Sequence, residues 1–187
     1  AGWKTLLMKI EKLGFRRFFV SHLSQMLLLS QSSQVSCTEN VYVYNDAAVK
    51  MLKENGVVHF CYPLENDFEN LKSMKNKQGF VVLHAYPELF FSRMPVQVSN
   101  DLNRFKDDSG KTFVKSNKEG MTIVTPTMPV SLFQYRKQLE EEGFSNFLID
   151  LKHEQVTKNA LKKVMTKFRL GEQFQPSTVF NFKKGLV

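Results

Sequence analysis

The stretch from Val41 to Leu64, VYVYNDAAVKMLKENGVVHFCYPL, most restricts how this chain can fold. Its β-branched and aromatic run Val41–Tyr44 predicts a strand, and Val57–Cys61 predicts a second one. Between them, apolar residues at helical spacing predict a helix of about ten residues, which Gly56 ends. A strand, a helix and a strand joined by short turns form a βαβ unit. The sequence therefore predicts parallel neighbouring strands with a right-handed crossover.

The same alternation continues on both sides of this unit. Before it, we predict a helix, a strand, a short helix and a polar loop, over Thr5–Leu13, Phe15–Val20, Leu23–Leu29 and Gln31–Asn40. After it, we predict a helix over Asp67–Lys75 and a strand over Phe80–Ala85, then a helix that begins at Pro129 and Ser131, a strand over Asn146–Ile149 and a helix over Thr157–Phe168. These segments predict an α/β fold with five parallel strands.

The segment between the fourth and fifth predicted strands departs from the alternation. Leu89–Val98 is expected to be irregular and extended. The turn signal Asp107-Asp108-Ser109-Gly110 joins two short strand patterns, Asn103–Lys106 and Thr112–Val114. We therefore predict an antiparallel hairpin inserted at residues 100–125, which covers one edge of the parallel sheet.

Two architectures fit five parallel strands, a doubly wound open sheet and part of a (β/α)₈ barrel. Neither G-x-G-x-x-G nor G-x-x-x-x-G-K-[ST] follows a predicted strand, which argues against a nucleotide-binding open sheet. A full barrel needs roughly 250 residues. A chain of 187 residues is too short for one, so on the barrel reading it is a partial, TIM-barrel-like sheet that needs more chain or a partner to close.

The charge balance favours anionic partners. The chain has a formal net charge of +8, with 26 basic and 18 acidic side chains. RNA and phosphorylated metabolites are partners of that kind. The alternative is a lysine-rich surface that is only solvated. The sequence has no run of about 20 apolar residues and no signal-peptide pattern, so we expect no membrane partner and a cytoplasmic location.

In either architecture, ligands bind at the C-terminal ends of the parallel strands. Polar residues that follow the predicted strands are therefore the candidate ligand residues: His22, Asn45, Asp46, Glu65, Tyr86, Glu88, Arg93 and Asp150. The fold would bring them to one rim. The sequence contains no motif of a known nucleophile, zinc protease or Cys–His pair, so the catalytic residues are unknown.

Several of these residues have a structural alternative. Asn45 and Asp46 are good helix N-caps. Glu65 begins a predicted helix, where the macrodipole stabilises a carboxylate. Arg93 either binds an anionic ligand or pairs with Glu88.

Several stretches of the sequence resemble the collagenase-like peptidase family U-32. The stretch VYVYNDAAVKMLKENGVVHFCYPLEN is similar to a family segment in which an Asn-containing strand end leads to a helix, Gly-Val and a Glu-containing strand end. FVVLHAYPELFFSRMPV resembles the family's strand and its R-x-P segment. LNRFKDDSGKTFVKSNKEGMTIV, FLIDL and VFNFKKGLV resemble its hairpin, a later strand and its closing segment. The resemblance implies a single domain over residues 1–187 that forms the C-terminal part of a larger (β/α) barrel.

The family's name implies a protease. Its relatives also use an iron–sulfur cluster to hydroxylate RNA bases or quinone rings. The cysteines that hold this cluster follow the strand that corresponds to Phe80–Ala85, and this chain reads HAYPELFFSRMPV there. Cys37 and Cys61 are too few to hold a cluster or a structural zinc ion. We therefore expect no cofactor or metal held by this chain.

Three functions fit these features of the sequence. The chain could be part of an RNA-base or quinone-ring hydroxylation system, a protease, or a non-catalytic binding or oligomerisation module. The expected partners are RNA or an anionic small molecule, together with a second copy or a partner chain that completes the barrel.

Overall fold

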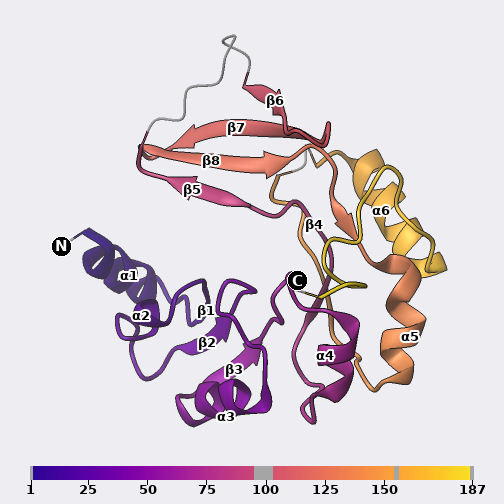
Figure 1. Cartoon of the computed structure of the whole chain (residues 1–187). Coiled ribbons are helices and arrows are strands. Elements are labelled where there is room, and N and C mark those ends of the chain that lie inside the picture. Colours follow the sequence, from indigo (N-terminus) through magenta and orange to yellow (C-terminus); the bar gives the residue numbers. More distant parts are fainter. Residues whose placement is uncertain (1, 95–102, 154–155, 186–187) are drawn as a thin grey trace. The chain divides into compact units, whose positions relative to one another are not determined.

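The computed structural model describes residues 2–94, 103–153 and 156–185 (Figure 1). The chain is mixed α/β and contains a parallel sheet, as predicted. It divides into two compact units. Unit 1 consists of Ala1–Val82, Gln138–Leu148 and Phe180–Val187, and unit 2 consists of Leu83–Lys137 and Ile149–Val179. The strands of the described residues form three separate sheets and no closed barrel.

Unit 1 is built on a parallel sheet with the order β1-β2-β3 (Figure 1). Its strands are β1 (Arg17–Val20), β2 (Gln34–Cys37) and β3 (Val57–Phe60). Its complete helices are α1 (Gly2–Lys12), α2 (Leu23–Met26), α3 (Asp46–Glu54) and α4 (Phe68–Ser73). Cys61 and Phe80 form a parallel bridge, which extends the parallel pairing beyond β3 towards β4 (Val81–Ala85). Strand β4 passes from unit 1 into unit 2.

The middle strand of this sheet corrects the sequence prediction. β2 lies inside Gln31–Asn40, which we predicted as a polar loop, and Val41–Tyr44 is not a strand. Val41 and Val43 are buried while Tyr42 is exposed, so their alternation reflects the packing of an unpaired extended segment. β2 forms because backbone pairing with a strand on each side and the burial of its last three residues outweigh its polar composition.

The helix predicted between the two strands forms as α3. The Ala48 N–H donates to Oδ1 of Asn45 (2.8 Å), which makes Asn45 the N-cap. Val49 and Leu52 are its buried residues. Gly56 follows the helix with φ of 79°, a conformation that glycine adopts without steric cost.

The core of unit 1 also receives residues from late in the chain. β10 (Phe147–Ile149) lies beside β4, where the Val81 N–H donates to the carbonyl oxygen of Asn146 (3.0 Å). Leu139 and Phe144 are buried, and the Phe144 ring packs edge-on against Tyr62 at 5.7 Å between ring centroids. Sequence-distant segments therefore complete this core.

Unit 2 contains a four-stranded antiparallel sheet with the order β5-β8-β7-β6 (Figure 1). Its strands are β5 (Phe90–Ser92), β6 (Arg104–Lys106), β7 (Thr112–Lys118) and β8 (Met121–Pro126). The predicted turn forms, because the Lys111 N–H donates to Oδ1 of Asp107 (2.8 Å). β5 corrects the expectation of an irregular segment over Leu89–Val98, of which residues 95–98 lie outside the described residues.

The helix predicted to begin at Pro129 and Ser131 begins later. Val130–Ser131 is a strand, β9, which pairs antiparallel with Ala85 and His84 of β4. This pairing takes the backbone out of helical geometry until the 3-10 turn η1 (Phe133–Tyr135). Helix α5 (Arg136–Glu141) follows and passes from unit 2 into unit 1.

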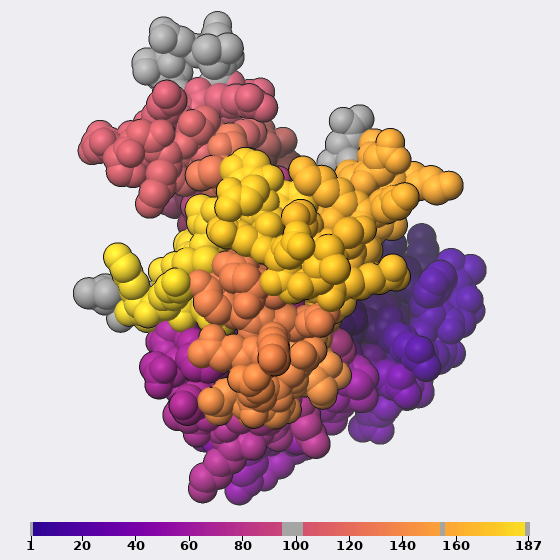
Figure 2. All heavy atoms as spheres, turned by 90° about the vertical axis from the view of Figure 1, so that its right-hand side faces the viewer, coloured from indigo at the N-terminus to yellow at the C-terminus, as the bar shows by residue number. Residues whose placement is uncertain are grey.

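The core of unit 2 is aromatic. The buried His84 ring stacks on Phe133 at 5.5 Å and meets the edge of Phe174 at 5.0 Å. Phe133 also contacts Phe168 of α6 (Lys158–Leu170). The segment after α6 lies against this helix (Figure 2), with Lys163 Nζ 5.0 Å from the Phe174 ring centroid. No helix in the described part of the chain combines the length and the apolar character needed to cross a membrane.

Candidate functional site

Four polar side chains meet in unit 2, and we call them the strand-end cluster: Glu88, Asp150, Lys152 and His153. Nε2 of His153 lies 3.1 Å from Oε1 of Glu88. Nζ of Lys152 lies 3.6 Å from Oε2 of Glu88 and 4.0 Å from Oδ2 of Asp150. Their side chains keep between 21% and 43% of their surface exposed, so a ligand can reach them.

The two neighbouring strands β4 and β10 place this cluster. Asp150 directly follows β10, and its N–H donates to the carbonyl oxygen of His84 in β4 (2.8 Å). Oδ1 of Asp150 then accepts from the Lys152 N–H (2.8 Å), which forms a turn stabilised by the aspartate side chain. Glu88 comes three residues after the end of β4. The cluster therefore lies at the C-terminal ends of these two strands, where α/β folds bind ligands.

Two of its members were predicted and two were not. Glu88 and Asp150 follow predicted strands and were chosen for that reason. Lys152 and His153 lie two and three residues beyond Asp150, and only the turn at Asp150 directs them to Glu88. The motif Asp-x-Lys-His after a strand was a usable signal, because aspartate often forms such a turn.

The cluster brings together a carboxylate, an imidazole and an ammonium group. A carboxylate beside an imidazole fixes the orientation of the ring. The ammonium group of Lys152 can bind a phosphate or a carbonyl oxygen while it remains close to Glu88. The His84 ring is fully buried among aromatic rings. His59 is exposed and meets the edge of Phe80.

In unit 1 the predicted residues Asn45 and Asp46 have structural roles. Asn45 caps α3. The Asp46 carboxylate accepts from the Lys75 N–H (3.0 Å) and from the Asn76 N–H (2.9 Å). These two hydrogen bonds lower the pKa of Asp46. Asp46 therefore fixes the loop after α4, and its oxygens are already used by the backbone.

His22 is also a capping residue. Its Nδ1 accepts from the Ser24 N–H (3.2 Å), and the Gln25 side chain accepts from the His22 N–H (3.1 Å). These two bonds form a capping box for α2. The predicted role of His22 at a ligand rim stays a prediction.

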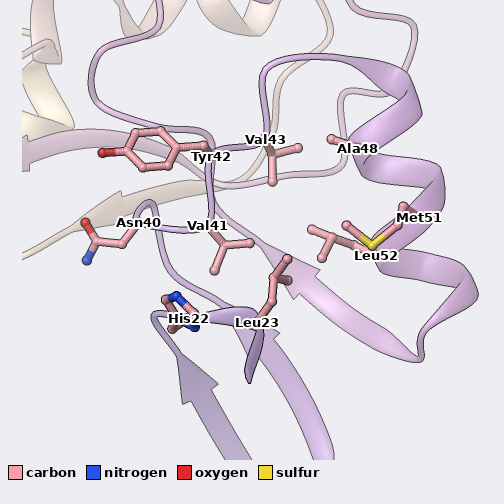
Figure 3. A pocket seen from close by; sticks show the side chains of 9 residues that line it. All are labelled: His22, Leu23, Asn40, Val41, Tyr42, Val43, Ala48, Met51 and Leu52. Atoms are coloured by element: carbon pink, nitrogen blue, oxygen red, sulfur yellow. The ribbon is translucent and has the colours of Figure 1, made fainter. Parts of the chain in front are cut away.

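A cavity of about 340 Å³ lies beside His22 (Figure 3). Met51 and Leu52 enter it from α3, while Asn40 and Tyr42 lie on its other side (Figure 3). The remaining lining residues are Leu23, Val41, Val43 and Ala48. The lining is mostly apolar, so this cavity offers space but few groups that could act on a substrate.

Of the other three predicted residues, Glu65 and Arg93 join neither group, while the half-buried Tyr86 meets the edge of the His84 ring at 6.3 Å between ring centroids. Glu65 is half-buried in the turn after β3. Burial and then the charge of Glu65 raise the pKa of Tyr44 to about 12. Arg93 is exposed just after β5. Among the described residues Glu88 pairs with Lys152 and His153, so the alternative pair with Arg93 does not form.

The two cysteines do not fit an iron–sulfur cluster. Cys37 and Cys61 are free and buried. Burial raises the pKa of the Cys37 thiol to about 11 and that of the Cys61 thiol to about 12, so both stay protonated. Within residues 2–94, 103–153 and 156–185, no three His, Cys, Asp or Glu side chains are grouped so that they could hold a metal ion. We therefore assign no step to a cluster held by this chain.

Comparisons with protein-family models, with curated proteins and with solved structures found no match to this chain. The resemblance to family U-32 therefore stays a prediction from the residues themselves.

Proposed function

We propose that this chain is a component of an RNA-base or quinone-ring hydroxylation system, and that it binds and orients the ring at the strand-end cluster. The observation that carries the proposal is the contact between Glu88 and His153, with Lys152 beside it. These groups can hold a proton at the imidazole and bind a phosphate or carbonyl oxygen through the ammonium group. The resemblance to family U-32 supplies the reaction class.

The proposal includes a partial, TIM-barrel-like fold for the C-terminal part of a larger barrel. The parallel run β1-β2-β3, with the bridge to Phe80, supports it. Hydrogen bonds of Val81 with Asn146 and of His84 with Asp150 add β10, because the partner numbers rise together as they do in parallel strands. Residues 1–187 as a single barrel domain, and a cytoplasmic location, stay predictions.

Within this proposal the chain contributes binding and proton transfer. The Glu88 carboxylate orients the His153 ring, whose nitrogen atoms can donate to or accept from the edge of a bound base or quinone. Nζ of Lys152 lies within 4.0 Å of both carboxylates of the cluster, and it can exchange one of these contacts for an anionic group of the ligand. The net charge of +8 favours RNA as the partner.

The test is the binding of a fluorescein-labelled mixed-sequence RNA, followed by fluorescence anisotropy at low and at high salt. We expect binding at low salt that weakens with salt, since phosphate contacts release counterions. The double variant K152Q/H153Q is expected to bind about tenfold more weakly, a loss of about 1.4 kcal/mol. The matched control His22→Asn keeps a capping side chain in unit 1 and is expected to bind normally.

Two results would overturn the proposal. One is the absence of binding to this RNA at low salt together with the absence of binding to a soluble short-chain quinone. The other is equal binding by the wild-type chain and K152Q/H153Q, since the cluster would then have no part in recognition.

A non-catalytic binding or oligomerisation module is the second candidate function. The observation that favours it is the apolar surface of unit 1 around β1, where Trp3 and Phe19 are 68% and 63% exposed. An interaction surface of this kind does not require chemistry at the strand ends. Light scattering separates this candidate, because a monomer at all concentrations argues against self-association.

A further inference from the structure

An apolar groove of about 320 Å³ lies beside the first strand of unit 1, and we call it the β1 groove. It is lined chiefly by Trp3 and Leu7 of α1, by Phe18 and Phe19 of β1, and by Leu28 and Leu29 after α2. All of these residues belong to one compact unit. The groove is therefore formed within unit 1 alone.

The surface around the groove exposes large apolar side chains. α1 has an amphipathic pattern but no buried residue. Trp3 and Phe19, which line the groove, are 68% and 63% exposed, and Leu13, Phe15 and Leu27 of the same unit are 77%, 61% and 87% exposed. Grouped exposure of this kind marks an interaction surface, whereas single exposed leucines are ordinary.

The groove also borders an open sheet edge. β1 is the first strand in the order β1-β2-β3, and within the described residues it has a neighbour on one side only. An edge strand presents backbone N–H and C=O groups that a further strand can pair with. A lipid surface cannot pair with these groups, so the edge favours a protein segment over a membrane.

The two elements that line the groove, α1 and β1, carry basic side chains, and we call these side chains the basic rim. Over residues 2–20 they are Lys4, Lys9, Lys12, Arg16 and Arg17, against a single carboxylate, Glu11. Oε1 of Glu11 accepts from the hydroxyls of Ser30 (2.7 Å) and Ser33 (2.6 Å). These hydrogen bonds lower the pKa of Glu11 to about 2, so the carboxylate is already satisfied internally. A second copy of this chain would bring the same basic rim and repel the first.

We propose that the β1 groove docks a segment of a partner protein that pairs with β1 as an added strand, with apolar side chains in the groove and acidic side chains facing the basic rim. Main-chain pairing would supply affinity and the alternate side chains specificity. Arg17 and Phe19 lie on the same face of β1, because side chains alternate along a strand. The partner strand would therefore place a carboxylate opposite Arg17 and an apolar side chain opposite Phe19. This inference extends the proposed partner that completes the sheet, but it does not involve the strand-end cluster.

Trp3 gives a direct readout, because it is the only tryptophan of the chain. The probe is a synthetic peptide of about nine residues in which Ile alternates with Glu, N-methylated along one edge so that it cannot stack on itself. Its matched control carries Lys in place of Glu. We expect the acidic peptide to shift the Trp3 emission to shorter wavelength in a saturable way, more weakly at high salt, and the basic peptide to have no effect.

Variants of the chain then separate the charged contribution to peptide binding from the apolar contribution. The double variant K12E/R17E is expected to bind the acidic peptide at least tenfold more weakly and to bind the basic peptide instead. Phe19→Ser is expected to lose binding, and the control Phe91→Ser, which changes a comparably exposed phenylalanine in unit 2, is expected to keep it. Circular dichroism confirms that each variant is folded.

Three results would overturn the inference. The first is equal binding of both peptides, which would mean that charge has no role. The second is a Trp3 shift with phosphatidylserine vesicles but not with the acidic peptide. The third is a dimer in light scattering that persists in Phe19→Ser, together with no peptide binding. Failure of both RNA and quinone binding with intact peptide binding would refute the proposed function and leave the β1 groove unaffected.

Discussion

The two units use the polar residues that we predicted at strand ends in different ways. In unit 1 the oxygens of Asn45 and Asp46 accept from backbone N–H groups, so they hold a helix and a loop in place. In unit 2 Glu88 meets the side chains of Lys152 and His153. In unit 1 the predicted strand Val41–Tyr44 does not form, so Asn45 and Asp46 do not follow a strand, whereas Glu88 follows β4. Polar side chains become available when the nearby backbone donors are satisfied elsewhere.

The two units also differ in how their apolar residues are covered. The rings of unit 2 close around His84 and Phe133, which are both fully buried. In unit 1 the sheet is covered by α3, while α1 buries none of its residues. We therefore expect truncation of a phenylalanine side chain to lower the free energy of unfolding far more in unit 2 than in unit 1.

The largest expected effect comes from Phe133→Ala in unit 2. This change removes a buried ring that contacts His84 and Phe168, and we expect a loss of about 3–5 kcal/mol in the free energy of unfolding. Phe19→Ala in unit 1 is the matched change at a ring that is 63% exposed, with an expected loss under about 0.5 kcal/mol. Urea unfolding measures both. Similar losses would contradict the contrast between a closed and an open region.

Asp46→Ala should have an intermediate effect, confined to unit 1. The Lys75 and Asn76 N–H groups lose their acceptor, and we expect a loss of about 1 kcal/mol at neutral pH, because water partly replaces the carboxylate. The pKa of Asp46 is lower in the folded chain, so its contribution is present above the unfolded pKa of about 4 and is lost as pH falls through the folded value. The stability difference between wild type and variant should therefore shrink in acid. An unchanged difference at low pH would show that Asp46 acts otherwise.

A cap in each unit tests whether local helix chemistry differs between them. Asn45→Ala and Thr157→Ala each remove a side-chain oxygen that accepts from a backbone N–H of α3 or α6. We expect each to cost about 1 kcal/mol, while Asn45→Ser and Thr157→Ser cost little. Denaturant titration of the four variants decides it. A loss in one unit alone would mean that the units differ in more than packing and site chemistry.

The smallest effect on stability is expected at the site itself. Glu88→Gln changes a partly exposed charge pair, so we expect a change of less than about 1 kcal/mol in the free energy of unfolding. Lys152→Gln alters the same charge pair and is expected to weaken ligand binding at a similarly small cost in stability, which separates function from stability. A loss of several kcal/mol would instead assign Glu88 a structural role like that of Asp46.

The sequence predicted most elements of the fold and missed those that depend on distant pairing. The helices α3 and α6 formed as predicted because apolar spacing, capping residues and a final glycine all agree locally. The strand β2 was missed because QVSC has a weak local pattern, and it forms through backbone pairing with β1 and β3. In the site, His153 was missed because only the turn after Asp150 brings its ring to Glu88.

The four histidines allow the most direct test of the central claim, that the strand-end cluster of unit 2 is the ligand site. His22 and His59 lie in unit 1, and His84 and His153 lie in unit 2. Ring carbon–proton NMR spectra can follow all four while a mixed-sequence RNA or a soluble quinone is added at low salt. The account predicts the largest shift for His153 and little change for His22. A shift centred on His22, with His153 unchanged, would contradict it.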